Sequence, residues 1–420
     1  MSREMMRLGA FLMPTGHHIA AWRHPAAAAD AGVNLSHMIE LAQTAERGLF
    51  DLIFFEDAAG VREGRVHLAA QTARSIGFEP ISLLAALAAS TTKVGLVATA
   101  STSYNEPYAL ARAFATLDLL SGGRAGWNLV TSASEIEAAN FGAQGLRAHR
   151  DRYARANEFA EVVTRLWSPS ARTGLVGHEG ENFAVRQGLG IPPSAQGAPV
   201  MVQAGSSDVG RDLAARTADV VFVAAQTYDT AKSFRDDVRA RMSRAGRNPD
   251  HIKILPGVSP IVADSREEAQ ETFEKLQALI PDEVGLALLE SYLATDALKG
   301  LPLEGPLPEL KSSEGMQSRQ QLVIEQSQRE GMSIRQVARH FAGARGHWRL
   351  VGTAADVADE LEAWFTGGAA DGFNVMPAYF PGELQSFVDR VVPELQRRGL
   401  FRTAYEETTL RANLGLAAVL

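Results

Sequence analysis

The chain is constrained most by an alternation of short apolar runs with segments of helical periodicity. Eight apolar runs with the length of buried strands fall at 5–13, 49–58, 93–98, inside 121–153, and at 198–205, 219–225, 251–263 and 371–380. Segments with apolar residues three or four positions apart follow them. This pattern predicts an α/β fold in which a parallel sheet closes into a (β/α)8 TIM barrel. An open, doubly wound sheet is the alternative fold for the same pattern.

Two segments interrupt the alternation inside what we expect to be a single domain of residues 1–420. Residues 168–195 are rich in Gly and Pro, which predicts an insertion with a small hairpin at about 180–188. Residues 281–348 have helical periodicity without a barrel strand, which predicts a second insertion. Residues 401–420 are apolar, whereas loose chain ends are usually polar, so we expect an arm that packs on the barrel or on a neighbouring subunit.

Composition limits the classes of partner. The net charge is −8, which does not favour nucleic acid or an anionic membrane. No apolar run has membrane-spanning length, and the first residues lack the pattern of a secretory signal. The chain has no cysteine, which excludes disulfides, thiolate nucleophiles and cysteine-bound metals and fits a cytoplasmic protein.

Polar side chains gather where the predicted strands end, and in a barrel these ends meet on the face that binds ligands. The candidates are His17 and His18, Glu56 and Asp57, Thr99 and Ser101, Asn128, Thr131 and Ser132, and Gly205, Ser206 and Ser207. No HExxH, GxSxG, P-loop or GxGxxG motif is present, and no carboxylate cluster has metal-ligand spacing. Polar groups without a nucleophile or a metal predict an organic cofactor that carries the chemistry.

The segment VMVQAGSSDVGRDLA is the best candidate for a cofactor phosphate site. Gly205 lets a ligand approach the backbone, and Ser206 and Ser207 begin a helix, where free N–H groups favour a phosphate. The same serines could merely cap the helix, and the residues alone favour that second interpretation.

For several other residues the sequence leaves more than one role open. His17 and His18 could bind substrate or act as a general acid, or they could be solvent-facing and structural. Arg345, His347 and Trp348 lie in the second insertion and could line an entrance. Only Arg23 among the arginines is expected near the strand ends, which favours a neutral, partly apolar substrate over a polycarboxylate.

Several runs, taken together and in order, resemble one family. They are LMPTGHHIAAWRHP, SGGRAGWNLVTS, AANFG, HRDRYARANEF, PVMVQAGSSDVGRDLAA and VGTAADVADELEAWF. The resemblance is to the luciferase-like flavin-dependent monooxygenases, in the branch of nitrilotriacetate monooxygenase component A and dibenzothiophene-sulfone monooxygenase. It implies a TIM barrel, reduced FMN (FMNH2) as a diffusible co-substrate, O2, and a separate NAD(P)H:flavin reductase.

The resemblance also implies roles for single residues. Asp57 and Thr99 would contact the flavin ring, His149 and Tyr153 would bind the flavin, and Gly205, Ser206 and Ser207 would hold its phosphate. Asn128 would face the N5 edge of the ring with Thr99 across from it. From these roles we expect Asn128 and Thr99 to be catalytic residues, and from its position at the end of the first predicted strand we expect the same of His17.

The implied function is a two-component monooxygenase that cleaves a carbon–heteroatom bond of a small organic substrate through a flavin peroxide, of C4a or N5 type. We expect a homo-oligomer, either a dimer or a tetramer. One alternative is an F420-dependent oxidoreductase on the same fold, although such relatives generally lack the GWN and HRDRY combination. Another is a non-catalytic barrel that stores or senses FMN.

Overall fold

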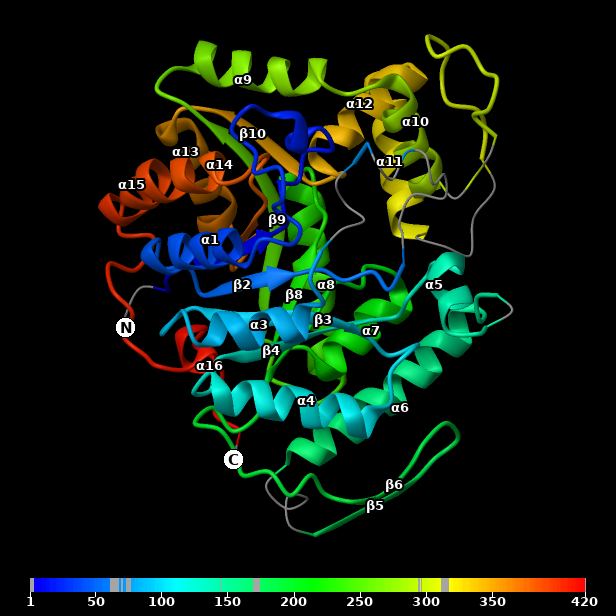
Figure 1. The fold of residues 1–420 in the computed structure, drawn as a ribbon, viewed down its shortest axis with the longest axis vertical. Helices are drawn as coiled ribbons and strands as arrows, with labels where there is room; N and C mark the ends of the chain where they lie inside the picture. Colours follow the sequence, from blue (N-terminus) through cyan, green and yellow to red (C-terminus); the bar gives the residue numbers. More distant parts are fainter. Residues whose placement is uncertain are drawn as a thin grey trace.

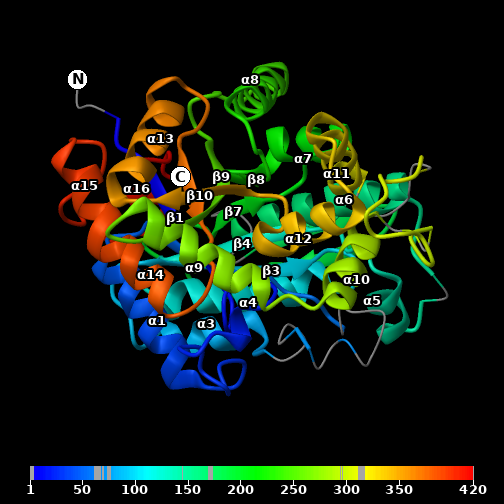
Figure 2. The ribbon, with the colours of Figure 1, turned by 90° about the horizontal axis from the view of Figure 1, so that it is seen from above.

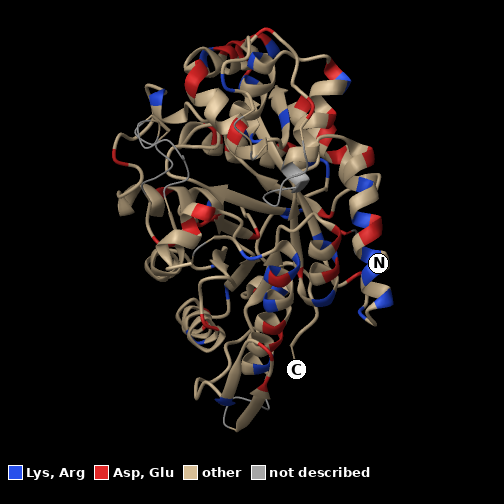
Figure 3. Ribbon diagram, turned by 90° about the vertical axis from the view of Figure 1, so that its right-hand side faces the viewer, with Lys and Arg blue, Asp and Glu red and all other residues tan. Residues whose placement is uncertain are grey.

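The computed structural model describes residues 4–60, 68, 71–72, 77–143, 145–168, 174–293, 295, 297–310 and 317–419. A sheet lies at the centre, and helices surround it (Figure 1). Lys and Arg are interspersed with Asp and Glu over the outer helices (Figure 3), as expected for a solvated surface. Within the described residues, no helix is long and apolar enough to cross a membrane.

Eight parallel strands form a closed ring. They are β1 (Arg7–Leu12), β2 (Leu52–Phe55), β3 (Gly95–Ser101), β4 (Ala125–Val130), β7 (Val200–Gln203), β8 (Val220–Val223), β9 (Lys253–Val262) and β11 (Gly372–Val375). The ring closes because β9 pairs with both β8 and β11, while β11 pairs in turn with β1. The prediction of a TIM barrel is confirmed, and the open sheet is excluded.

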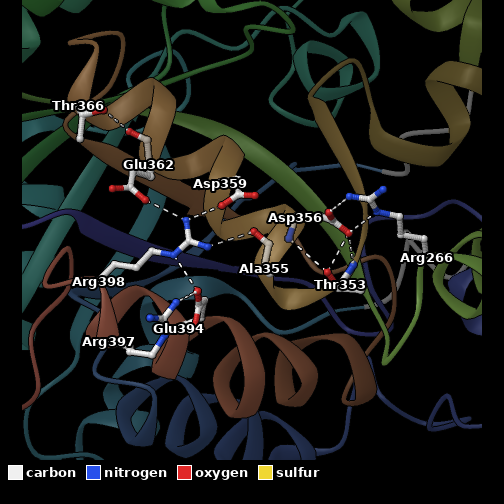
Figure 4. Close-up of polar contacts among 10 residues, drawn as sticks. All are labelled: Arg266, Thr353, Ala355, Asp356, Asp359, Glu362, Thr366, Glu394, Arg397 and Arg398. Carbon is white, nitrogen blue, oxygen red and sulfur yellow. Dashed lines mark hydrogen bonds and ion pairs between the residues drawn. The ribbon is translucent and has the colours of Figure 1, made fainter.

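Helices cover the outside of the ring. They are α1 (Leu35–Arg47), α3 (Pro80–Ala88), α4 (Pro107–Leu120), α6 (His149–Trp167), α7 (Asp208–Thr217), α8 (Tyr228–Arg244), α9 (Arg266–Ala278), α13 (Ala354–Thr366), α14 (Gly382–Ser386) and α15 (Val392–Arg397). Arg398 ties two of them together: its guanidinium lies 2.7 Å from Asp359 and 2.9 Å from Glu362 on α13, and 2.8 Å from Glu394 on α15 (Figure 4).

The pleat of β4 decides which of its side chains reach the barrel interior. Trp127 packs outward, with ring centroids 6.1 Å from Phe114 of α4 and 5.7 Å from Phe159 of α6. Because successive side chains of a strand alternate between faces, Asn128 points into the barrel. Its register partner on β3 is Thr99, which therefore shares this inner layer.

A ninth parallel strand, β10 (Trp348–Gly352), was not predicted. The sequence pattern placed residue 348 at the end of a helical insertion, but Trp348–Gly352 pairs with Val258–Val262 of β9. The strand β9 has ten residues, and its second half extends beyond the pairing with β8 and β11. It therefore offers a free edge that a short segment can join.

The two segments that interrupt the alternation hold structure of their own. The first contains the hairpin of β5 (Leu175–Glu179) and β6 (Ala184–Gln187), while residues 169–173 lie outside the described part. The second contains α10 (Asp282–Leu293), α11 (Gln317–Glu330) and α12 (Ile334–Ala344), which share a small apolar core including Leu293, Val323 and Phe341. Residues 294, 296 and 311–316 are not described. Seen from above, α12 lies between α9 and α11 (Figure 2).

The C-terminal segment packs against the end of the barrel at which the strands begin. It contains the short helix α16 (Leu410–Asn413), and Leu410 is fully buried. A Cβ atom at Gly95 would lie 2.4 Å from the Leu410 side chain, and one at Gly126 would lie 3.5 Å from it. Leu410 therefore fills the space that two inward-facing glycines leave at this end.

Candidate active site

Thr99 and Asn128 form a hydrogen-bonded pair where β3 and β4 end. The Thr99 hydroxyl donates to the carbonyl oxygen of Phe55 at 2.8 Å, and Asn128 Nδ2 donates to Thr99 Oγ1 at 2.9 Å. Because the Thr99 proton is committed to Phe55, Thr99 can only accept from Asn128, which fixes the orientation of the amide. The two side chains are 4% and 3% exposed, so the pair is held in the barrel interior.

The Asn128 amide keeps one unused hydrogen-bonding group. Its Oδ1 is buried and has no hydrogen-bond partner among the described residues. A buried carbonyl without a hydrogen bond lowers the stability of the fold by about 1–3 kcal/mol. A ligand that donates a hydrogen bond to it would remove this penalty, so the group marks a candidate ligand contact. The arrangement suits a planar ligand that presents an N–H donor to the end of β4.

The N-terminus of α7 lies beside α6. Ser207 is its N-cap, and its hydroxyl accepts from the backbone N–H of Gly210 at 3.2 Å. A Cβ atom at Gly205 would lie 3.1 Å from Gly210 Cα, and one at Gly210 would lie 3.1 Å from Tyr153 Oη. The structure thus brings Gly205, Ser207 and Tyr153 together, and the lack of side chains at the two glycines lets this hydroxyl approach the helix end.

The other residues of these segments are more exposed. The rings of His149 and Tyr153, one turn apart on α6, lie 4.7 Å apart. His149 and Ser206 are half-buried. Asp57 is exposed two residues after the end of β2. Asp57 therefore lies above the inner layer that holds Thr99 and Asn128.

A partly buried ion pair, which the sequence did not predict, lies at the same end of the barrel. Arg345 Nη2 donates to Glu56 Oε2 at 2.9 Å, and Arg345 Nη1 lies 3.3 Å from His17 Nδ1. Burial lowers the pKa of Arg345, but Glu56 and Tyr292 together hold it above its usual value. Arg345 ends α12 with φ 55°, a left-handed conformation that side-chain-bearing residues adopt at a cost. The cation is already neutralised by Glu56, so it adds little net charge to the site.

His17 is engaged at both ring nitrogens. Its Nε2 lies 2.8 Å from the carbonyl oxygen of Phe11, which can only accept, so Nε2 carries the proton. Nδ1 then accepts from Arg345. This geometry suits the orientation of Arg345 better than proton donation to a substrate.

Aromatic rings line the barrel interior beneath this ion pair. Phe11 and Phe54 lie 4.7 Å apart, Phe222 lies 5.6 Å from Phe11, and His347 stacks on Phe222 at 5.0 Å. Trp348 points elsewhere and stacks on Trp364 of α13 at 3.9 Å. Of the three entrance candidates, Arg345 and His347 are thus at the site and Trp348 is not.

Sequence reasoning missed two glutamines at the ends of β7 and β8. Gln203 Oε1 and both amide atoms of Gln226 are buried without hydrogen-bond partners among the described residues. The only signal was position, since Gln203 is the last residue of β7 and Gln226 lies three residues after β8; near Gln203, the following Gly and Ser residues obscured it. No group of three or more His, Asp or Glu residues in the described part could hold a metal ion.

The fold and this site define a class of protein. A TIM barrel presents an aromatic interior, unpaired amide groups and a helix N-terminus with a tyrosine hydroxyl on the face where strands end. These groups fit a flavin mononucleotide: the amides can meet the polar edge of its ring, and the end of α7 can meet its phosphate.

Comparison with known proteins gives the family. A model of the luciferase-like monooxygenases matches residues 11–371. N-acetyl-S-(2-succino)cysteine monooxygenase of Bacillus subtilis (strain 168) and nitrilotriacetate monooxygenase component A of Aminobacter aminovorans are each 44% identical to the chain, over 99% of it and 97% of their own lengths. A crystal structure of riboflavin lyase with modified FMN and riboflavin has a TM-score of 0.88 and 30% identity, covering 99% of this chain and 96% of the other. The chain belongs to the luciferase-like monooxygenase family and is a flavin-dependent monooxygenase.

Proposed function

We propose that this chain is the oxygenase component of a two-component system, which takes reduced FMN from a separate NAD(P)H:flavin reductase and uses O2. The name of one relative, nitrilotriacetate monooxygenase component A, supports a system of more than one component. The unpaired Oδ1 of Asn128 carries the proposal. It is an acceptor with a fixed orientation, and the reduced flavin ring carries an N5–H donor that the oxidised ring lacks.

Each residue then has a task in holding the cofactor. Asn128 would accept from the ring edge, with Thr99 fixing its amide. Tyr153, Gly205 and the N-terminus of α7, with Ser206 and Ser207, would hold the phosphate, and His149 would pack beside Tyr153. Asp57 would contact the ring from the exposed rim. When bound, reduced FMN supplies the two electrons that activate O2.

The aromatic interior and the helices above it would keep water away from the reacting groups. Phe11, Phe54 and Phe222 exclude water from below. Arg345 and Glu56 join α12 to the barrel, so the α10–α12 unit would cover the site. His17 would act as a positioning residue for Arg345, although the sequence suggested a catalytic role.

We propose a small organic substrate in which a carbon–heteroatom bond is cleaved. Two relatives are named for substrates with C–N or C–S bonds, nitrilotriacetate and N-acetyl-S-(2-succino)cysteine. Among the described residues, Arg345 is the cation that lies over the aromatic interior, and Glu56 neutralises it, which keeps the preference for a neutral, partly apolar substrate. Location in the cytoplasm and assembly into a dimer or tetramer are further predictions of the sequence.

The first experiment is an anaerobic titration of the protein with oxidised and with photoreduced FMN, followed by a pulse of O2 monitored by absorbance. We expect at least tenfold tighter binding of the reduced form and slower reoxidation than for free flavin. Equal affinity for both forms, with reoxidation at the rate of free flavin, would contradict the proposal.

A further inference from the structure

The ion pair of Arg345 and Glu56 lies next to the hydrogen-bonded pair of the flavin site. Glu56 directly follows Phe55, the last residue of β2, and the Phe55 carbonyl accepts from the Thr99 hydroxyl at 2.8 Å. Thr99 in turn accepts from Asn128 at 2.9 Å. Because consecutive Cα atoms are about 3.8 Å apart, the carboxylate of Glu56 belongs to the edge of the same site.

The guanidinium of Arg345 lies over the aromatic interior of the barrel. It is 5.8 Å from the centroid of the Phe11 ring, and Phe11 packs against Phe54 at 4.7 Å and against Phe222 at 5.6 Å. The side chains of Arg345 and Glu56 are 12% and 20% exposed, so neither is sealed from solvent. A substrate whose apolar part contacts these rings would therefore bring its polar group to the ion pair.

Arg345 is held in place by more than Glu56. Its Nη1 lies 3.3 Å from Met13 Sδ and 3.3 Å from His17 Nδ1, and Tyr292 of α10 also hydrogen-bonds to it. Met13 is uncharged, and His17 accepts through Nδ1, so its ring is neutral. Glu56 Oε2, at 2.9 Å, supplies the negative charge. Removal of that charge would therefore leave the guanidinium in position and no longer neutralised by Glu56.

We propose that Glu56 is a specificity-determining residue that makes this site select a neutral substrate over a carboxylate. The inference rests on the proposed function, because it concerns the substrate of the same site. A guanidinium is a planar fork of donors that suits a carboxylate, but Glu56 already occupies Arg345. A substrate carboxylate would lie beside this like charge, which disfavours its binding, whereas a neutral amide meets no such repulsion. Without the charge of Glu56, the same site should prefer carboxylates.

Calorimetric titration of the full-length protein, without flavin, tests this inference with 3-phenylpropionate and 3-phenylpropanamide. The two probes share an aromatic ring and differ in the charge of the head group. We expect the unaltered protein to bind the amide at least about tenfold more tightly than the carboxylate. Glu56→Gln should raise the affinity for the carboxylate at least about tenfold and change that for the amide less than about twofold. A general loss of packing would change both affinities in the same direction.

Two further variants separate the charge of Glu56 from other effects. Glu56→Gln combined with Arg345→Met removes both charges, and replacing an ion pair by uncharged residues of similar volume is often tolerated. This protein should bind the two probes within about twofold of each other, and it keeps the test valid if Glu56→Gln folds poorly. The matched control is Asp264→Asn, two residues after β9, which removes an exposed carboxylate that pairs with Arg390 at 2.6 Å. It should discriminate between the probes like the unaltered protein.

Three results would overturn the inference. The unaltered protein would bind the carboxylate as tightly as the amide, or Glu56→Gln would gain no affinity for the carboxylate at concentrations up to about 10 mM. The third is an equal gain in the Asp264→Asn protein, which would assign the effect to net charge. These titrations contain no flavin, so they can fail while reduced FMN binds as proposed, and the preference can reverse even if the titration with FMN fails.

Discussion

The two ends of the barrel differ in whether their buried polar side chains have hydrogen-bond or ion-pair partners. Where the strands begin, Asp51 is fully buried and pairs with Arg402, and Arg411 pairs with Asp219 at 2.7 Å. Where the strands end, Asn128 Oδ1 and Gln203 Oε1 are buried without partners among the described residues. At the first end the buried carboxylates are paired with arginines, although Arg7 Nε and Arg411 Nε have no partner among the described residues. At the second end the amide oxygens themselves are left without partners in the described part of the chain. TIM barrels generally bind ligands where their strands end and are stabilised where their strands begin. We therefore call the end where the strands begin the stabilising end, and the end where they finish the binding end.

The largest expected effect of a single substitution is at the stabilising end. Arg402→Met would leave Asp51 buried without its closest cation, while Arg7 remains at 3.7 Å. Breaking a buried pair in this way costs about 3–5 kcal/mol of unfolding free energy. Chemical denaturation measures the loss, and the protein that remains folded should bind reduced FMN normally. Weakened flavin binding with unchanged stability would reverse the assignment of the two ends.

Leu410→Ala should have the next largest effect. Leu410 fills the space beside Gly95 and Gly126, and truncating a fully buried leucine costs about 2–5 kcal/mol. Removal of everything after Gly399 should cost more, because it also removes Arg402. Melting temperatures of the two proteins would test the order; an unchanged melting temperature after truncation would show that the arm contributes nothing.

Asp118 offers a pH-dependent test at the same end. Burial raises its pKa to about 6, although Ser194, the Ala125 N–H and Gln196 donate hydrogen bonds to it. Because the folded pKa is raised, the protonated form contributes stability that is fully present below about pH 4 and is lost as the pH rises through about 6. Asp118→Asn should therefore be stabilising by on the order of 2 kcal/mol at pH 8, with little gain at pH 4. Melting temperatures of both proteins between pH 4 and pH 8 measure this gain. A difference in melting temperature that is the same at every pH would contradict the prediction.

The sequence predicted one end of the barrel better than the other, for a physical reason. Thr99 directly follows an apolar run and Asn128 lies within another, so local pattern places both on strands of the barrel. The contacts of the stabilising end join Arg402 to Asp51, 351 positions apart, and no local pattern reveals such a pair. The strand β10 was missed because it is short and joins only the extended half of β9. The partnership of Arg345 with Glu56 was missed because it depends on where α12 ends.

Asn128→Ala is the sharpest test of the binding end. It removes the unpaired acceptor, so we expect affinity for reduced FMN to fall about tenfold, or about 1.4 kcal/mol. Stability should change by less than about 1 kcal/mol, because the substitution also relieves an unpaired buried group. The matched control is Asn413→Ala at the other end, where Oδ1 accepts from Arg402 at 3.1 Å. It should lose stability and keep its flavin affinity; equal effects of the two substitutions on flavin binding would break the comparison.

Tyr153→Phe should have the smallest effect, because it removes one hydroxyl and keeps the ring against His149. The hydroxyl lies near Gly210 at the N-terminus of α7, so its loss should weaken FMN binding by about 0.5–1.5 kcal/mol, the net value of one hydrogen bond. Riboflavin lacks the phosphate, so its affinity should not change if the hydroxyl acts on that group. Tyr405→Phe provides the control, since Tyr405 donates to the Phe50 carbonyl at 2.6 Å at the stabilising end. It should lower the melting temperature without changing FMN affinity. An equal loss of FMN and riboflavin affinity in Tyr153→Phe would move the phosphate site away from α7, because the hydroxyl would then act on the ring or its ribityl chain.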